Sequence, residues 1–89
     1  MVRERIQFLG RVQGVGFRYT CATLAGQQGL TGWVRNEPNG TVLAEFQGEQ
    51  SQIDAVVTAL GQGHFIRIDN LIRNPMAVKS KEKSFRITN

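Results

Sequence analysis

The sequence has few residues that bind metals or serve as nucleophiles: one cysteine, Cys21, and one histidine, His64. A single cysteine cannot form a disulfide within the chain, and a metal site built from a cluster of Cys and His ligands is excluded. A Ser-His-Asp triad would have to use the one imidazole. Cys21 falls on the apolar side of a predicted helix, which indicates a small buried hydrophobe, and His64 is predicted to lie in a loop. Neither residue is therefore predicted to be catalytic.

Long apolar runs are also absent. No segment approaches the roughly 18 apolar residues that a membrane-spanning helix requires. Residues 3–5 are charged and are followed by alternating rather than continuous apolar residues, which is not the pattern of a signal peptide. The 89 residues suffice for one core. We therefore expect a single domain over residues 1–89, located in the cytoplasm and without a membrane partner.

Acidic residues are outnumbered: eleven Lys and Arg against seven Asp and Glu give a formal net charge of +4. This balance favours anionic partners, either phosphorylated small molecules or nucleic acid, without choosing between them. The basic residues are scattered along the chain, and their only cluster is Lys79, Lys81 and Lys83. We interpret that cluster as a solvated loop.

The apolar pattern alternates in some segments and has helical spacing in others. Two glycines interrupt the first alternating segment, and Glu37, Pro38, Asn39 and Gly40 form the strongest turn signal. Ser51 and Asp54 are predicted to cap the second helix. The pattern predicts strands at residues 2–12, 30–36, 41–47, 65–73 and 85–87, and helices from residue 17 to shortly before 29 and around residues 53–60.

The order strand, helix, strand, strand, helix, strand is typical of the α+β ferredoxin-like two-layer sandwich (βαββαβ). In this fold, two helices cover one face of an antiparallel sheet. The first and third strands are expected to be central. The pattern leaves open whether the second strand lies outside the third or outside the first. Fold alone does not determine function, because many activities use this architecture.

The segment at residues 13–18, Gln-Gly-Val-Gly-Phe-Arg, connects the first strand to the first helix. Helix N-termini have unpaired amides that attract anions, and glycines allow successive amides to converge. Arg18 can add donors that match phosphate oxygens. The alternative is a tight turn whose arginine points into water. A dinucleotide-binding fingerprint that starts at Gly14 and Gly16 would need a glycine at position 19, where this chain has Tyr19. The phosphate-loop pattern GxxxxGK[ST] does not occur either, so the common nucleotide-binding loops are excluded.

Asn36 ends the second predicted strand, just before the turn. Its side chain carries both a donor and an acceptor, so it could orient a water molecule beside a bound phosphate. The alternative is a turn-entry residue that bonds its own backbone. Trp33, nearby, is interpreted as a packing or rim residue rather than a platform for stacking bases.

Three runs, at residues 10–18, 29–36 and 39–42, together resemble the acylphosphatase family over nearly the whole chain. The resemblance implies a hydrolase that cleaves acyl phosphates without cofactor or metal. It also implies that the amides of Val15, Gly16, Phe17 and Arg18 bind phosphate, that the Arg18 guanidinium completes the site, and that Asn36 positions the attacking water. The chain departs from the family pattern at Gln28, Asn39 and Leu43.

Two other functions remain as alternatives. A nucleic-acid-binding module of the same fold would stack bases on aromatics of the exposed sheet face, but the outward positions of the third strand, Thr41, Leu43, Glu45 and Gln47, offer none. The second alternative is a catalytically silent relative, or a piece like the domain that opens larger carbamoyl-transferring enzymes. We expect a monomer that acts on a small acyl phosphate and binds no nucleic acid.

Overall fold

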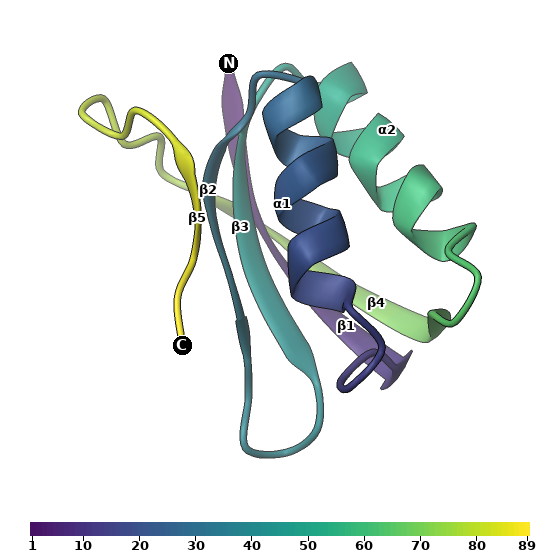
Figure 1. Cartoon of the computed structure of the whole chain (residues 1–89). Helices are drawn as coiled ribbons and strands as arrows, with labels where there is room; N and C mark the ends of the chain where they lie inside the picture. The colour runs from purple at the N-terminus through teal and green to yellow at the C-terminus, as the bar shows by residue number, and fades with distance from the viewer.

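The computed structural model describes residues 1–89 as two helices packed on one face of a five-stranded sheet (Figure 1). This is the predicted ferredoxin-like α+β architecture. No helix is long and apolar enough to cross a membrane. The elements are β1 (Val2–Arg11), α1 (Phe17–Gln27), β2 (Thr31–Asn36), β3 (Val42–Gly48), α2 (Gln50–Gly61), β4 (Arg67–Met76) and β5 (Phe85–Ile87).

The strands lie in the order β4-β1-β3-β2-β5, so β2 lies outside β3, a point that the sequence left open. The first four strands pair antiparallel, as predicted. The expectation of a wholly antiparallel sheet is wrong for β5, which pairs parallel with β2. The chain between β4 and β5 crosses to the far edge of the sheet and enters it in the same direction as β2 (Figure 1).

Several element ends differ from the prediction. β4 begins at Arg67 rather than at residue 65, and it continues through Pro75, which an edge strand tolerates because its outer side has no hydrogen-bonding partner. β1 ends at Arg11 after a bulge at Leu9 and Gly10. Ser51 and Asp54 do not cap α2: Glu49 and Gln52 form the capping box there, because the helix begins two residues earlier than that prediction requires.

The core lies between the helices and the sheet, and aromatic rings connect its layers. Phe8 of β1 packs on Phe17 of α1 with ring centroids 4.9 Å apart, and Phe46 of β3 stacks on Phe85 of β5 at 5.4 Å. Cys21 is fully buried in this cluster, as predicted, and burial raises the pKa of its thiol. A buried thiol with a raised pKa is a packing group rather than a nucleophile.

The sheet face away from the helices is not open, which corrects the expectation for the outward positions of β3. Thr41, Glu45 and Gln47 are buried there. Arg3 of β1, 1% exposed, donates from Nε to Glu45 at 2.7 Å and from Nη1 to Glu82 at 2.6 Å.

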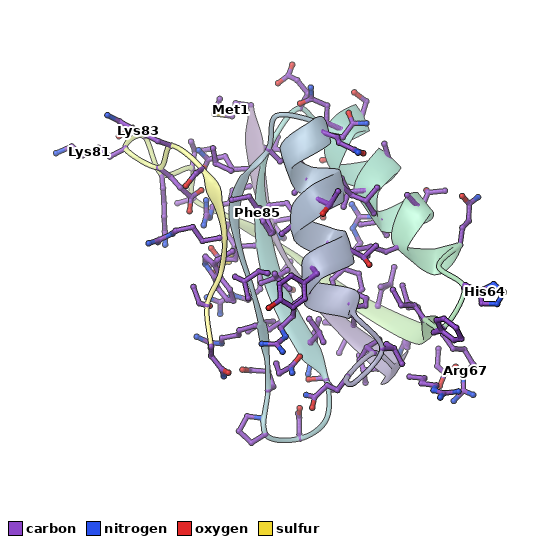
Figure 2. The ribbon with its side chains drawn as sticks, viewed as in Figure 1. Met1, His64, Arg67, Lys81, Lys83 and Phe85 are labelled. Carbon is purple, nitrogen blue, oxygen red and sulfur yellow. The ribbon has the colours of Figure 1, made fainter.

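Residues 77–84, which we call the arm, cover this face. Glu82 attaches the arm to Arg3 of the sheet. Gln47 of β3 attaches it a second time, because its side-chain oxygen accepts from the Lys79 amide at 2.8 Å and its side-chain nitrogen donates to the Lys79 carbonyl at 2.9 Å. Lys81 and Lys83 point outward at its tip (Figure 2). The lysines are exposed, as predicted, but the main chain that carries them is anchored on the sheet.

The ion pairs of Arg3 with Glu45 and with Glu82 of the arm predict that the protein loses stability in acid. Burial by itself raises the pKa values of Glu45 and Glu82, but hydrogen bonds and nearby positive charges together outweigh it, so both pKa values lie below the ordinary 4.5. Arg3 acts on both carboxylates, Arg5 adds to its effect at Glu45, and Thr31 and Lys79 add to it at Glu82. Their contribution is therefore complete above about pH 4.5 and is lost as pH falls through their lowered folded-state values. Urea unfolding between neutral pH and about pH 3 measures this loss.

Glu82→Gln should flatten that pH dependence and lower the free energy of unfolding at neutral pH by about 2 kcal/mol. Asp69→Asn, which removes a carboxylate from the exposed pair with Arg67, is the control and should leave the slope unchanged. Equal slopes in the wild type and Glu82→Gln would contradict the assignment.

Candidate functional site

The loop between β1 and α1 has left-handed backbone at two glycines, Gly14 (φ 73°) and Gly16 (φ 78°). A Cβ at either position would meet nothing within 4 Å, so glycine is required there by backbone conformation and not by space. Alternation of ordinary and left-handed backbone is the arrangement in which successive amides form an anion-binding nest. The predicted phosphate loop therefore has the expected backbone.

The amides of this loop have no acceptors within the protein. None of the chain's hydrogen bonds outside regular elements uses the amide of Val15, Gly16, Phe17 or Arg18 as donor, and the first helical bond of α1 runs from Thr20 to Gly16. Gly16 provides no capping side chain and the first turn holds no acidic residue. In contrast, the capping box of α2 satisfies amides at its own start. The start of α1 thus keeps four donors available for an anion.

Phe17 fixes the place of these donors. Its ring is 2% exposed and packs on Phe8, so the side chain is part of the core and only the main chain faces the loop. Val15, next to it, is partly buried against the same core. Val12, at the other end of the loop, is buried in the same core, so apolar packing holds both ends of the loop although its glycines provide none.

Arg18 and Asn36 lie at the same end of the molecule, because both contact Asn89. Arg18 donates from Nη1 to the main-chain oxygen of Asn89 at 2.5 Å, and the Asn89 side chain donates to the Asn36 carbonyl at 3.4 Å. The amide of Thr88 donates to Val34 at 2.9 Å and keeps this segment beside β2. The structure thus brings together the two residues that the sequence analysis singled out.

The alternative role for Asn36 is filled by another residue. Asn39 accepts hydrogen bonds from the amide and the hydroxyl of Thr41, at 3.1 and 2.7 Å, and so caps the turn. The side-chain amide of Asn36 makes no hydrogen bond within the chain; Asn89 contacts only the main-chain carbonyl of this residue. Asn36 is therefore free to bind a molecule outside the protein.

Arg18 also forms no ion pair with an acidic side chain. All seven acidic side chains of the protein take part in ion pairs, and Arg18 belongs to none of these pairs. Its guanidinium bonds a main-chain oxygen instead of pointing only into water. A free cation beside free amides favours a dianion such as a phosphoryl group.

The side chains of His64 and Trp33 form no hydrogen bond with the loop, Arg18 or Asn36. His64 is in the loop before β4, as predicted, and Figure 2 shows it at the right-hand side of the molecule. Trp33 is partly buried, and Arg35 lies over its ring at 4.9 Å, which makes it a packing residue. No group of three or more His, Cys, Asp or Glu side chains is arranged to hold a metal ion.

For two residues of the site region, the sequence predicted no role of the side chain. Gln13 donates from Nε2 to the carbonyls of Glu37 and Thr41, at 2.8 and 2.9 Å, and Asn89 joins Arg18 to Asn36. Gln13 stood inside the predicted loop, but its partners depend on how the loop meets the β2–β3 turn. No local pattern in the sequence marks Asn89.

The loop predicts a selective effect of glycine substitution. Gly16→Ala and Gly29→Ala both place a Cβ on left-handed backbone with open space around it, so each should cost about 1–2 kcal/mol of stability. Gly29 lies beyond the opposite end of α1. Inorganic phosphate should raise the melting temperature of the wild type and of Gly29→Ala by similar amounts. The increase should be much smaller for Gly16→Ala. Equal phosphate stabilisation of both variants would place the anion elsewhere.

Comparison with known proteins agrees with this geometry. The family model "Acylphosphatase" matches residues 4–87. The acylphosphatase of Clostridium acetobutylicum is 39% identical over 98% of this chain and 97% of that protein, and the one of Geobacillus kaustophilus is 41% identical over 98% and 94%. The crystal structure of acylphosphatase from Bacillus subtilis superposes with a TM-score of 0.92 at 31% identity and covers both chains fully. The chain therefore belongs to the acylphosphatase family.

Proposed function

We propose that this protein is an acylphosphatase that hydrolyses the carboxyl-phosphate bond of a small acyl phosphate, with its phosphoryl group bound by the amides of Val15, Gly16, Phe17 and Arg18. The Arg18 guanidinium completes the phosphate site. The observation that carries this proposal is the set of four amides without internal acceptors, together with an arginine that forms no ion pair with an acidic side chain. Membership of the family supports it independently.

Asn36 has the second role, which is to orient the attacking water. Its amide group is unbonded within the chain and can hold the water with its oxygen while its nitrogen contacts the phosphoryl group. The water oxygen bonds to phosphorus, and the bond between phosphorus and the acyl oxygen breaks with its electrons on the carboxylate. The protons of the water remain on the phosphate, so an acyl phosphate dianion and water give a carboxylate and dihydrogen phosphate.

So few groups suffice because the leaving group is a weak base. A carboxylate has a conjugate acid of pKa about 4, so it departs without protonation and no general acid is needed. Phosphoryl transfer passes through a loose transition state in which positioning and charge stabilisation provide most of the catalysis. Preorganised amides and one guanidinium provide both. All the groups proposed come from one chain, which is consistent with action as a monomer.

The nucleic-acid alternative receives little support from the sheet. Its far face is covered by the arm, and Glu45 and Gln47 are buried in polar contacts there. The one tryptophan has a guanidinium over its ring. Nothing on this face offers an open aromatic surface for bases.

The proposal predicts hydrolysis of acetyl phosphate or benzoyl phosphate in the presence of EDTA. Arg18→Ala should lower kcat/KM by about a hundredfold or more and weaken inhibition by inorganic phosphate, because it removes a phosphate donor. Asn36→Ala should lower kcat by a similar factor with little change in KM, because it affects the water and not the phosphate.

Arg86→Ala is the matched control, since it removes an exposed arginine of β5 that forms no ion pair, and it should retain wild-type turnover. Full activity in both Arg18→Ala and Asn36→Ala would refute the assigned residues. A folded wild-type protein without activity would instead identify a silent relative.

A further inference from the structure

Gln13 connects the phosphate loop to the hairpin that carries Asn36. Its Nε2 donates to the carbonyl of Glu37 at 2.8 Å and to the carbonyl of Thr41 at 2.9 Å. Glu37 follows Asn36 directly, and Thr41 stands on the other side of the turn. One amide group therefore bonds both sides of the hairpin at the point where Asn36 leaves the sheet.

No other hydrogen bond makes this connection directly; the second link is indirect, through Asn89, which contacts both Arg18 and the Asn36 carbonyl. The last paired residues of β1 and β3 are Phe8 and Val42, and beyond them the sheet no longer joins the two chain segments. Between residues 12–16 and residues 37–41, the hydrogen bonds of Gln13 are the only ones present. Gln13 is thus the one side chain that bonds the loop to the hairpin directly.

The hairpin closes without Gln13. The Glu37 amide donates to the Thr41 carbonyl at 2.9 Å, and the Gly40 amide donates to the Glu37 carbonyl at 3.1 Å. Each carbonyl therefore keeps one main-chain partner when Gln13 is absent, because a carbonyl can accept two bonds. Gln13 places the hairpin and does not form it.

We propose that Gln13 is a positioning residue that sets the place of Asn36, and of the water it orients, relative to the bound phosphate. This inference rests on the function proposed above. The Asn36 side chain has no internal hydrogen bond of its own, so the main chain beside it determines where it points. In a reaction that depends on alignment, a displacement of about 1 Å can lower the rate about a hundredfold.

Gln13→Met keeps the length of the side chain and removes its donors. It should lower kcat with acetyl phosphate by about tenfold to a hundredfold. KM and the inhibition constant of inorganic phosphate should stay within about twofold of wild type, because the loop amides and Arg18 are unchanged. Gln13→Asn, which keeps the amide but is too short to span both carbonyls, should behave in the same way and provides a second variant if the first does not fold.

Gln7→Met is the matched control. Gln7 also extends from β1 to Thr41, but it donates to the hydroxyl at 3.1 Å and not to the main chain beside Asn36. This variant should keep the wild-type kcat. Thermal unfolding of all variants separates a change in stability from a change in turnover.

A double-mutant cycle decides between positioning and a general structural role. In an Asn36→Ala background, Gln13→Met should cause no further loss of kcat, because the group that it positions is gone. A full multiplicative loss in that background would overturn the inference, as would a loss of phosphate inhibition as large as the loss of kcat.

The two proposals fail in different ways. Wild-type protein that does not hydrolyse acetyl phosphate would refute the proposed function and this inference with it. An active wild type whose turnover is unaffected by Gln13→Met would refute only the role of Gln13.

Discussion

The structure depends on how the chain turns from β1 into α1. The Phe17 ring packs on Phe8 and fixes the start of the helix, while left-handed backbone at Gly14 and Gly16 leads into it. Because the cap of this helix is a glycine, its first amides are not satisfied by the protein itself. The free energy of core packing thus holds in place a set of donors that would otherwise bind water or a nearby side chain. A site for an anion follows from the same contact that forms the core.

The two faces of the sheet have separate roles. The face toward the helices holds the apolar core, and the opposite face holds the polar cluster of Arg3, Glu45, Gln47 and Glu82 beneath the arm. Every acidic side chain is engaged in an ion pair elsewhere, so no acidic side chain competes for the positive charge of Arg18. The loop, Arg18 and Asn36 lie at one end of the sheet, outside both the apolar core and the polar cluster. Position and charge therefore favour an anionic ligand at the same place.

Much of this could be predicted from the sequence. Alternation and helical spacing gave the elements, and the glycines of residues 13–16 marked the loop. Features that depend on contacts between distant segments could not be predicted. The parallel β5 follows from the path of the arm, and the burial of Glu45 follows from Arg3 and Glu82, which are far apart in the chain. The bonds of Gln13 and Asn89 also span many residues. Local patterns have no information on such pairings.

The central claim is that four main-chain amides at the start of α1 bind the phosphoryl group. The most direct test is an amide NMR titration of the folded protein with inorganic phosphate. The account predicts that the largest saturable shifts fall on the amides of Val15, Gly16, Phe17 and Arg18, with smaller ones at the Asn36 side chain. Saturable shifts confined to the lysines of the arm, with the loop amides unmoved, would contradict it.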